Sequence, residues 1–199
     1  MTRLWERTVM FGSRSLASGF TMLQQGREES HSCCFCTVSP EFWFSWRYQL
    51  REFKSEFRVV AIDMRGYGES DLPLSADSYC FEYLVTDVKD IVEYLGYNRC
   101  YVVGHDWGGT IAWLFAIHYP EMVTKLIVLN CPHPTVFTDY ALRHPSQLLK
   151  CSHFFFFQLP RFPELMLSIN DFKVVCCVWV WAASRSRLCV HVSVDNHAC

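Results

Sequence analysis

The residues best suited to chemistry lie in one short stretch, Tyr101-Val102-Val103-Gly104-His105-Asp106-Trp107-Gly108-Gly109-Thr110. Its apolar residues predict the end of a buried strand, and its glycines predict a tight turn into a helix. The spacing Gly104-x-Asp106-x-Gly108 is typical of a nucleophile elbow, a strained strand-to-helix turn that leaves room only for glycine beside its exposed tip. Asp106 is predicted to stand at that tip.

The type of residue at the tip narrows the chemistry. A carboxylate is ionised at neutral pH, so Asp106 needs no base to activate it and can attack a carbon directly, forming an ester with the protein. A second interpretation stays open, because the same pattern is expected where an aspartate simply caps the helix of an ordinary strand-helix turn.

Length and charge restrict the kind of protein. A chain of 199 residues, 51% of them apolar, suits one domain or a fragment of a larger one. Its 18 basic and 20 acidic residues nearly balance, and there is no polybasic run. Nothing therefore favours nucleic acid or a membrane surface as the partner, and we expect a small molecule.

The cysteines indicate the cellular compartment of the protein rather than a metal-binding or catalytic site. Cys80, Cys100, Cys131 and Cys151 are isolated among apolar or helical residues, which is typical of reduced, buried thiols in an intracellular protein. The stretch from His31 to Cys36 resembles half of a zinc site, but no second ligand pair follows at a useful spacing. We expect no metal and no cofactor.

The elements around Asp106 alternate between helix and strand. A helical face is predicted for residues 42–54 and a second helix for residues 83–94, ended by Gly96. An almost wholly apolar helix follows the turn and stops before Pro120. The predicted strands are residues 57–63, 99–103 and 123–130. This order favours an α/β fold, a parallel sheet flanked by helices with the reactive group at the carboxyl end of a central strand.

The two ends of the chain lack this alternation. Residues 1–39 show no sustained period and are predicted to be an irregular segment, so that the first strands of the sheet would be missing. Residues 135–173, with helices expected at 139–150 and 164–170, read as the start of a lid. The tail, residues 174–199, contains an apolar patch that is too short to span a bilayer. Missing strands would leave unpaired edges and poor solubility.

Several motifs in order resemble one family. The sequence GHDWGG around Asp106, PEFWFSWRYQL at Pro40–Leu50, DMRGYGESDLP at Asp63–Pro73 and NCPHP at Asn130–Pro134 are similar to those of the epoxide hydrolases. These belong to the aspartate-nucleophile branch of the α/β-hydrolase superfamily, and the likeness is to vertebrate members. It extends from Pro40 to about Lys173 and implies a partial α/β-hydrolase core over residues 40–134.

The resemblance implies a two-step hydrolysis of a small apolar epoxide. Asp106 would open the ring to give an alkyl-enzyme ester, and a water activated by a histidine-acid pair would cleave the ester to a diol. The backbone N–H of Trp107 would be one oxyanion donor. Ser39, which precedes Pro40, is the candidate for the second, although the His-Gly pair of the family loop is absent. His153 aligns with the lid tyrosine that polarises the ring.

The family places its acid and histidine after the lid, and this sequence shows no such pair there. Asp195 and His197 lie close together in the tail, but they lack the strand-loop context. We therefore expect a truncated or alternatively spliced form without its own anchor, whose parent is membrane-anchored as the resemblance suggests. The alternatives are a catalytically inactive fragment, and a haloalkane dehalogenase, which shares the aspartate nucleophile followed by tryptophan.

Overall fold

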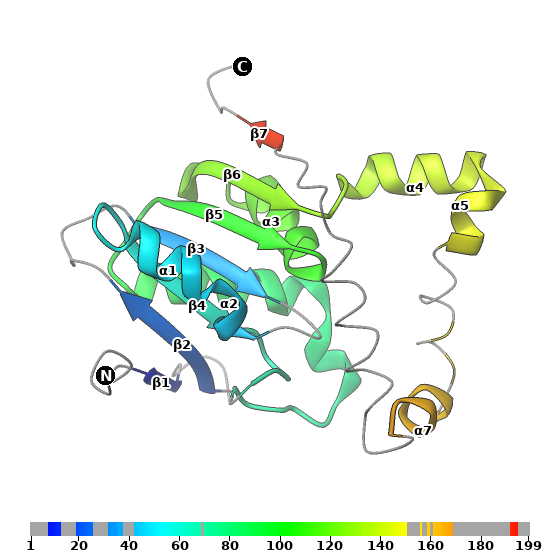
Figure 1. Cartoon of the computed structure of the whole chain (residues 1–199), viewed down its shortest axis with the longest axis horizontal. Coiled ribbons are helices and arrows are strands. Elements are labelled where there is room, and N and C mark those ends of the chain that lie inside the picture. Colours follow the sequence, from blue (N-terminus) through cyan, green and yellow to red (C-terminus); the bar gives the residue numbers. More distant parts are fainter. Residues whose placement is uncertain are drawn as a thin grey trace. The chain divides into compact units, whose positions relative to one another are not determined.

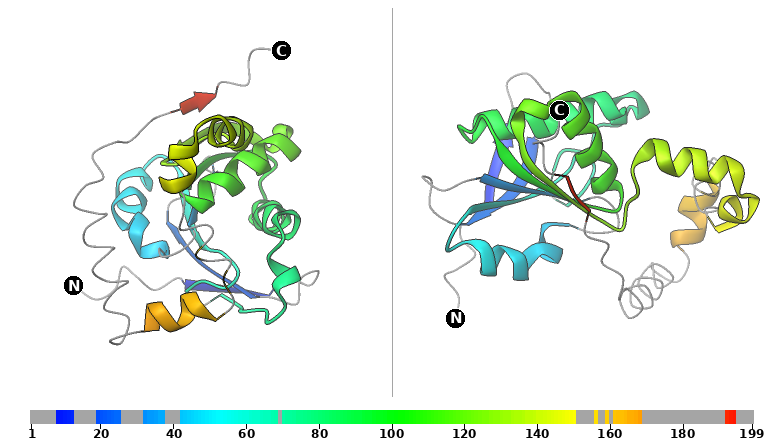
Figure 2. Two further views of the ribbon diagram at one scale, coloured as in Figure 1. Left: turned by 90° about the vertical axis from the view of Figure 1, so that its right-hand side faces the viewer. Right: turned by 90° about the horizontal axis from the view of Figure 1, so that it is seen from above.

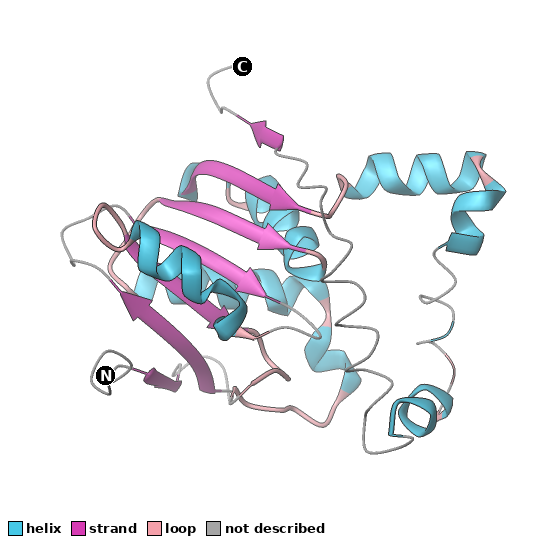
Figure 3. Ribbon diagram, in the orientation of Figure 1, coloured by secondary structure: helices cyan, strands magenta, loops and turns pink. Residues whose placement is uncertain are grey.

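Runs of β-branched and aromatic residues form the strands of a mixed sheet, and helices that bury apolar side chains against the sheet cover it (Figures 1 and 3). The protein is seen in a computed structural model, which describes residues 8–12, 19–25, 32–37, 42–68, 70–150, 156, 159, 161–168 and 192–194. The chain divides into two units. Residues 1–132 and 190–199 make the first, and residues 133–189 make the second.

The strands of the first unit are β1 (Thr8–Gly12), β2 (Gly19–Gln25), β3 (Ser32–Thr37), β4 (Arg58–Asp63), β5 (Cys100–His105), β6 (Val123–Leu129) and β7 (Val192–Val194). Its helices are η1 (Trp43–Trp46), α1 (Arg47–Phe53), η2 (Ala76–Tyr79), α2 (Phe81–Tyr94), α3 (Trp107–His118) and η3 (Pro120–Met122). The second unit contains α4 (Pro134–Arg143), α5 (Pro145–Lys150) and α7 (Phe162–Ser168).

The described strands form one seven-stranded sheet in the order β1-β2-β4-β3-β5-β6-β7. The central strands β4, β3, β5 and β6 run parallel, and β2 and β7 lie antiparallel to their inner neighbours. Strand β5, which leads to Asp106, is therefore paired on both sides. The α/β fold predicted from the alternation of helices and strands is confirmed.

The sheet separates two apolar clusters, because successive side chains of a strand face opposite sides. Val60 and Ile62 of β4 pack in the larger cluster with residues of α2 and α3, whereas Val59 and Ala61 pack in the smaller one with Trp46 and Leu50 of η1 and α1. Figure 2 shows α1 on one face of the sheet and α2 and α3 on the other. Strand β5 therefore lies between two apolar layers, with Val102 in the larger cluster and Val103 in the smaller one.

The prediction that residues 1–39 are irregular is wrong for three segments. Residues 8–12, 19–25 and 32–37 are strands, and β3 lies between β4 and β5. Phe20 and Met22 of β2 are buried in the larger cluster. The first strands of the sheet are therefore present, and the expected unpaired edges beside β5 do not exist, because β3 occupies that position.

The flanks of the sheet differ from the prediction in two further places. Residues Val192–Val194, expected to be part of a loosely packed tail, pair antiparallel with β6. The helix expected at residues 139–150 is divided, since α4 ends at Arg143 and α5 begins at Pro145. A proline lacks the backbone N–H that would continue the helix, and it disfavours helical backbone in the residue before it. His144 is accordingly extended.

Among the cysteines expected to be buried thiols, Cys100 is free and buried, and Cys131 is free and partly buried. Cys80 is also free but exposed, so for this residue the prediction of burial is wrong. Cys151 lies outside the described residues.

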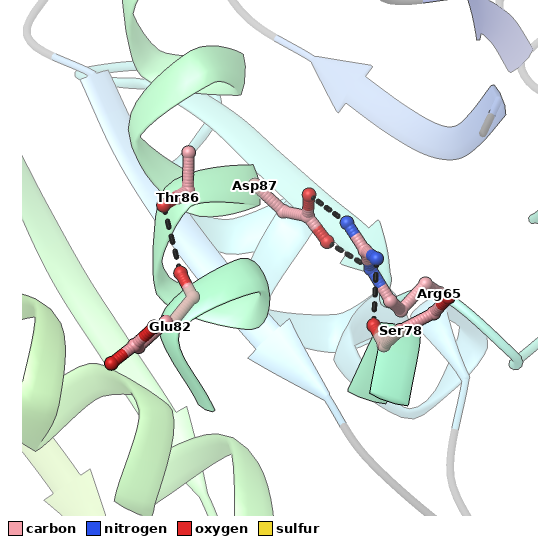
Figure 4. A network of polar contacts seen from close by, with 5 residues as sticks. All are labelled: Arg65, Ser78, Glu82, Thr86 and Asp87. Atoms are coloured by element: carbon pink, nitrogen blue, oxygen red, sulfur yellow. Dashed lines mark hydrogen bonds and ion pairs between the residues drawn. The ribbon is translucent and has the colours of Figure 1, made fainter. Parts of the chain in front are cut away.

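A buried ion pair fixes the turn that follows β4 (Figure 4). Arg65 donates from Nε and Nη2 to the two carboxylate oxygens of Asp87 on α2, at 2.6 and 2.5 Å, and from Nη1 to the carbonyl of Ser78 at 2.7 Å. Both charged side chains are almost completely buried. Burial raises the pKa of Asp87, and the hydrogen bond and charge of Arg65 oppose that rise. The pair therefore joins the turn to α2 without leaving an unpaired charge.

Candidate active site

Asp106 occupies a strained turn between β5 and α3. Its φ of 53° and ψ of −122° are rare for a residue with a Cβ, so the surrounding structure must hold it there. Its N–H donates to the carbonyl of Leu129 at 3.1 Å. Its own carbonyl accepts from the N–H groups of Gly109, at 2.9 Å, and Thr110, at 3.3 Å. The backbone of the turn is thus fixed from both sides.

The glycines beside Asp106 are required by close packing between β5, α3 and the end of β6. A Cβ on Gly104 would lie 2.5 Å from the carbonyl oxygen of Gly108 and 2.7 Å from the Cβ of Ala112. A Cβ on Gly109 would lie 2.6 Å from the Cβ of Cys131. Real Cβ atoms essentially never make non-bonded contacts this short, so a larger residue would displace the turn.

The side chain of Asp106 is exposed and makes no capping hydrogen bond with α3, although Asp106 stands at the N-cap position. The interpretation of Asp106 as a helix cap is therefore wrong. A carboxylate that is kept out of the hydrogen bonding of its own helix, on a turn held in a strained conformation, can approach an external electrophile.

The other residues assigned from the sequence are only partly described. Trp107 is the first residue of α3, with its side chain 41% exposed, and its backbone adjoins the Asp106 carboxylate along the chain. Ser39, His153, Asp195 and His197 lie outside the described residues. The assignment of Ser39 and His153 therefore stays a prediction.

Sequence reasoning did not assign Cys131, which follows β6 and lies beside the turn. Its Sγ is 3.3 Å from Oγ1 of Thr110 on α3. Burial raises the pKa of the Cys131 thiol, the negative charge of Asp106 raises it further, and the hydrogen bond with Thr110 opposes the rise. The contact with Thr110 places this thiol beside the first turn of α3, the helix that follows Asp106. In the sequence, only the position of Cys131 within the NCPHP motif suggested that this residue belongs to the site.

A second contact that was not predicted joins the ends of β5 and β6. Nδ2 of Asn130 lies 3.1 Å from Nε2 of His105, and Asn130 has a positive φ of 53°. Asn130 tolerates this backbone better than most residues with a side chain. Among the described residues, no three histidine, cysteine or acidic side chains lie close enough to share a metal ion. None of the described helices is long and apolar enough to cross a bilayer.

The α/β fold agrees with comparisons to known proteins. The sequence model of the alpha/beta hydrolase fold matches residues 34–162. The chain belongs to the α/β-hydrolase family. Within that family it is epoxide hydrolase-like: it is 68% identical over 136 residues to epoxide hydrolase 4 of Homo sapiens and 55% identical over 134 residues to epoxide hydrolase 3 of Xenopus tropicalis.

A solved structure supports the same relationship. The epoxide hydrolase of Bacillus megaterium, in complex with an inhibitor, superimposes with a TM-score of 0.76 at 34% sequence identity, covering 85% of this chain and 59% of the other. The matches to the human and Xenopus proteins cover 68% and 67% of this chain but only 38% and 36% of those relatives. The matched region is therefore less than two fifths of the length of these two proteins.

Proposed function

We propose that this chain carries the nucleophile of an epoxide hydrolase and that Asp106 forms an ester with an epoxide substrate. One observation supports this most strongly. The carboxylate of Asp106 is exposed, on a turn whose strained backbone is held by Leu129, Gly109 and Thr110. The names of the relatives supply the class of substrate, an epoxide.

The proposed step conserves all atoms of the substrate. One oxygen of the Asp106 carboxylate attacks a ring carbon, the bond from that carbon to the epoxide oxygen breaks, and the resulting alkoxide takes a proton to become a hydroxyl group. The product is a hydroxyalkyl ester whose added mass equals that of the whole epoxide. The N–H groups of Trp107 and Ser39 would stabilise the oxyanion when this ester is cleaved, and His153 stands where the resemblance expects the residue that polarises the ring.

Cleavage of the ester requires a water molecule activated by a base. The resemblance assigns no histidine-acid pair to residues 174–199, so we expect the polypeptide of 199 residues to stop at the ester. Residues 135–173 would form the start of the lid over the substrate.

Intact-mass measurement during incubation with a styrene-oxide-type epoxide tests both parts. We expect one added substrate mass per chain and at most one equivalent of diol. Sustained diol release would contradict the expected arrest at the ester, and no adduct at all would contradict the assignment of Asp106 as nucleophile. A haloalkane incubated in parallel separates dehalogenase chemistry, which would release halide and add only the alkyl group.

A further inference from the structure

The chain at the end of β6 contacts the turn that carries Asp106. Strands β5 and β6 are neighbours in the sheet (Figure 1), and His105 is the register partner of Leu129, so Asp106 and Asn130 are the next residues along each strand. Asp106 and Asn130 each have a φ of 53°, which is uncommon for residues with a side chain. Two adjacent strands therefore end in the same rare backbone conformation.

The side chain of Asn130 contacts the residue before Asp106. Its Nδ2 lies 3.1 Å from Nε2 of His105. An amide nitrogen can only donate, so Nε2 of His105 is the acceptor. The residue before Asn130, Leu129, accepts the N–H of Asp106 at its carbonyl, at 3.1 Å. A side-chain bond and a backbone bond thus join the same two pairs of consecutive residues, and together they limit how far the backbone between His105 and Asp106 can turn.

The residue after Asn130 contacts the other side of the turn. The Sγ of Cys131 lies 3.3 Å from Oγ1 of Thr110, and the N–H of Thr110 donates to the carbonyl of Asp106 at 3.3 Å. A Cβ on Gly109 would lie 2.6 Å from the Cβ of Cys131, so the chain after β6 packs directly against the first turn of α3. The left-handed backbone of Asn130 therefore lies between contacts to both sides of Asp106.

We propose that Asn130 is a positioning residue, which acts through His105 to hold the carboxylate of Asp106 in the orientation for attack. The side chain of Asp106 makes no capping hydrogen bond with α3, so its direction depends on the backbone of the turn. A nucleophile reacts fast only when it is aligned with the electrophile, and a displacement of about 1 Å can cost about 100-fold in rate. This inference rests on the proposed function, because it concerns formation of the Asp106 ester.

The test measures formation of the Asp106 ester at several concentrations of styrene oxide. Only adduct that hydroxylamine releases is counted, because this separates the ester from alkylated cysteines. The time courses give a maximal rate constant and a half-saturating concentration of the epoxide. Asn130→Gly removes the amide but keeps a positive φ without steric strain. His105→Gln keeps an acceptor that can reach Asn130, whereas His105→Leu has none.

We expect the maximal rate constant of Asn130→Gly to be about 10-fold lower than that of the wild type, at a similar half-saturating concentration, because the nucleophile is misaligned. His105→Leu should be slowed to a similar extent, and His105→Gln should react at close to the wild-type rate. Adding Asn130→Gly to His105→Leu should have no further effect, because the contact is already lost. A general loosening of the fold would instead slow both backgrounds alike. Variants are compared at a temperature where circular dichroism shows each of them to be folded.

An unchanged maximal rate constant for Asn130→Gly would overturn the positioning role. An equal loss in the His105→Leu background, or a His105→Gln variant as slow as His105→Leu, would overturn it too. If His105→Leu does not fold, Asn130→Gly alone decides the question: a lower maximal rate constant supports positioning, and a higher half-saturating concentration without that loss overturns it. Failure of the wild type to form any ester would overturn the proposed function, and this inference with it. That outcome is distinct from an ester that forms equally fast with and without the Asn130 amide.

Discussion

The backbone N–H of Asp106 donates to the carbonyl of Leu129 at 3.1 Å. Asp106 follows β5 and Leu129 ends β6, so the neighbouring strand, and not only the following helix, holds the turn. A strained backbone persists only where its surroundings over-determine it. Part of the free energy of folding is thus spent on keeping the carboxylate of Asp106 in an exposed position.

Substitutions at two glycines distinguish the cost of steric overlap from the cost of backbone strain. Gly104→Ala would push a Cβ into backbone atoms of Gly108 and Gly109, whereas Gly96 has a positive φ of 82° but open space around it. We expect Gly104→Ala to lower the free energy of unfolding by about 3 kcal/mol, and Gly96→Ala by about 1 kcal/mol. Urea denaturation measures both. Equal losses would show that β5 and α3 are not closely packed at the turn.

The thiol of Cys131 should report the charge of Asp106. Because burial and the charge of Asp106 both raise the pKa of Cys131, its alkylation by iodoacetamide should begin at a higher pH than that of an unperturbed cysteine thiol. Asp106→Asn removes the charge and should move the pH profile of Cys131 to lower pH. Peptide mass mapping separates the cysteines. An unchanged profile would place the carboxylate away from the thiol.

Removing one partner of the ion pair between Arg65 and Asp87 should lower the free energy of unfolding strongly, whereas replacing both partners by apolar residues should lower it little. Arg65→Met leaves a buried carboxylate without its partner and should cost about 3–5 kcal/mol, whereas Arg65→Met combined with Asp87→Leu should cost much less. Thermal and urea unfolding of the single and double variants form the cycle. Additive losses would contradict coupling between the two side chains.

The same pair predicts a dependence on pH. Burial already raises the pKa of Asp87, and loss of Arg65 removes the interactions that oppose this rise. A carboxyl group whose pKa is higher in the folded than in the unfolded state makes the folded state less stable as pH rises through its folded pKa. Arg65→Met should therefore lose less stability relative to wild type at about pH 5 than at about pH 8. The reverse order would refute this account.

The contribution of the first strands can be tested at Met22. This residue of β2 is completely buried, whereas Leu74 is almost completely exposed. We expect Met22→Ala to lower the free energy of unfolding by about 2–5 kcal/mol, and Leu74→Ala by less than about 0.5 kcal/mol. A negligible loss for Met22→Ala would show that β2 does not pack in the core, in line with the irregular segment that the sequence predicts for residues 1–39.

The central elements could be predicted because their patterns are strong. The runs that became β4, β5 and β6 are long and apolar, and Gly96 marks the end of α2 with the positive φ that this position needs. The exposed position of Asp106 also followed from its spacing with the two glycines. Local sequence was sufficient there because local and tertiary preferences agree.

The first strands could not be predicted because their signal is weak. Residues 19–25 read GFTMLQQ, where Phe20 and Met22 alternate with polar or small residues over only a few positions, and residues 32–37 are dominated by cysteine. Their pairing with β4 and β5, distant in sequence, determines their structure. The contacts of Asn130 and Cys131 are likewise tertiary, so no local pattern announces them.

Locating the adduct within the chain tests the central claim most directly. The chain contains 11 cysteines, which epoxides also alkylate, so the peptide carrying Asp106 must be identified by tandem mass spectrometry after incubation with a styrene-oxide-type epoxide. The account predicts one substrate mass on Asp106, released by hydroxylamine as an ester is and absent from Asp106→Asn. Modification confined to cysteines, resistant to hydroxylamine and unchanged in Asp106→Asn, would contradict it.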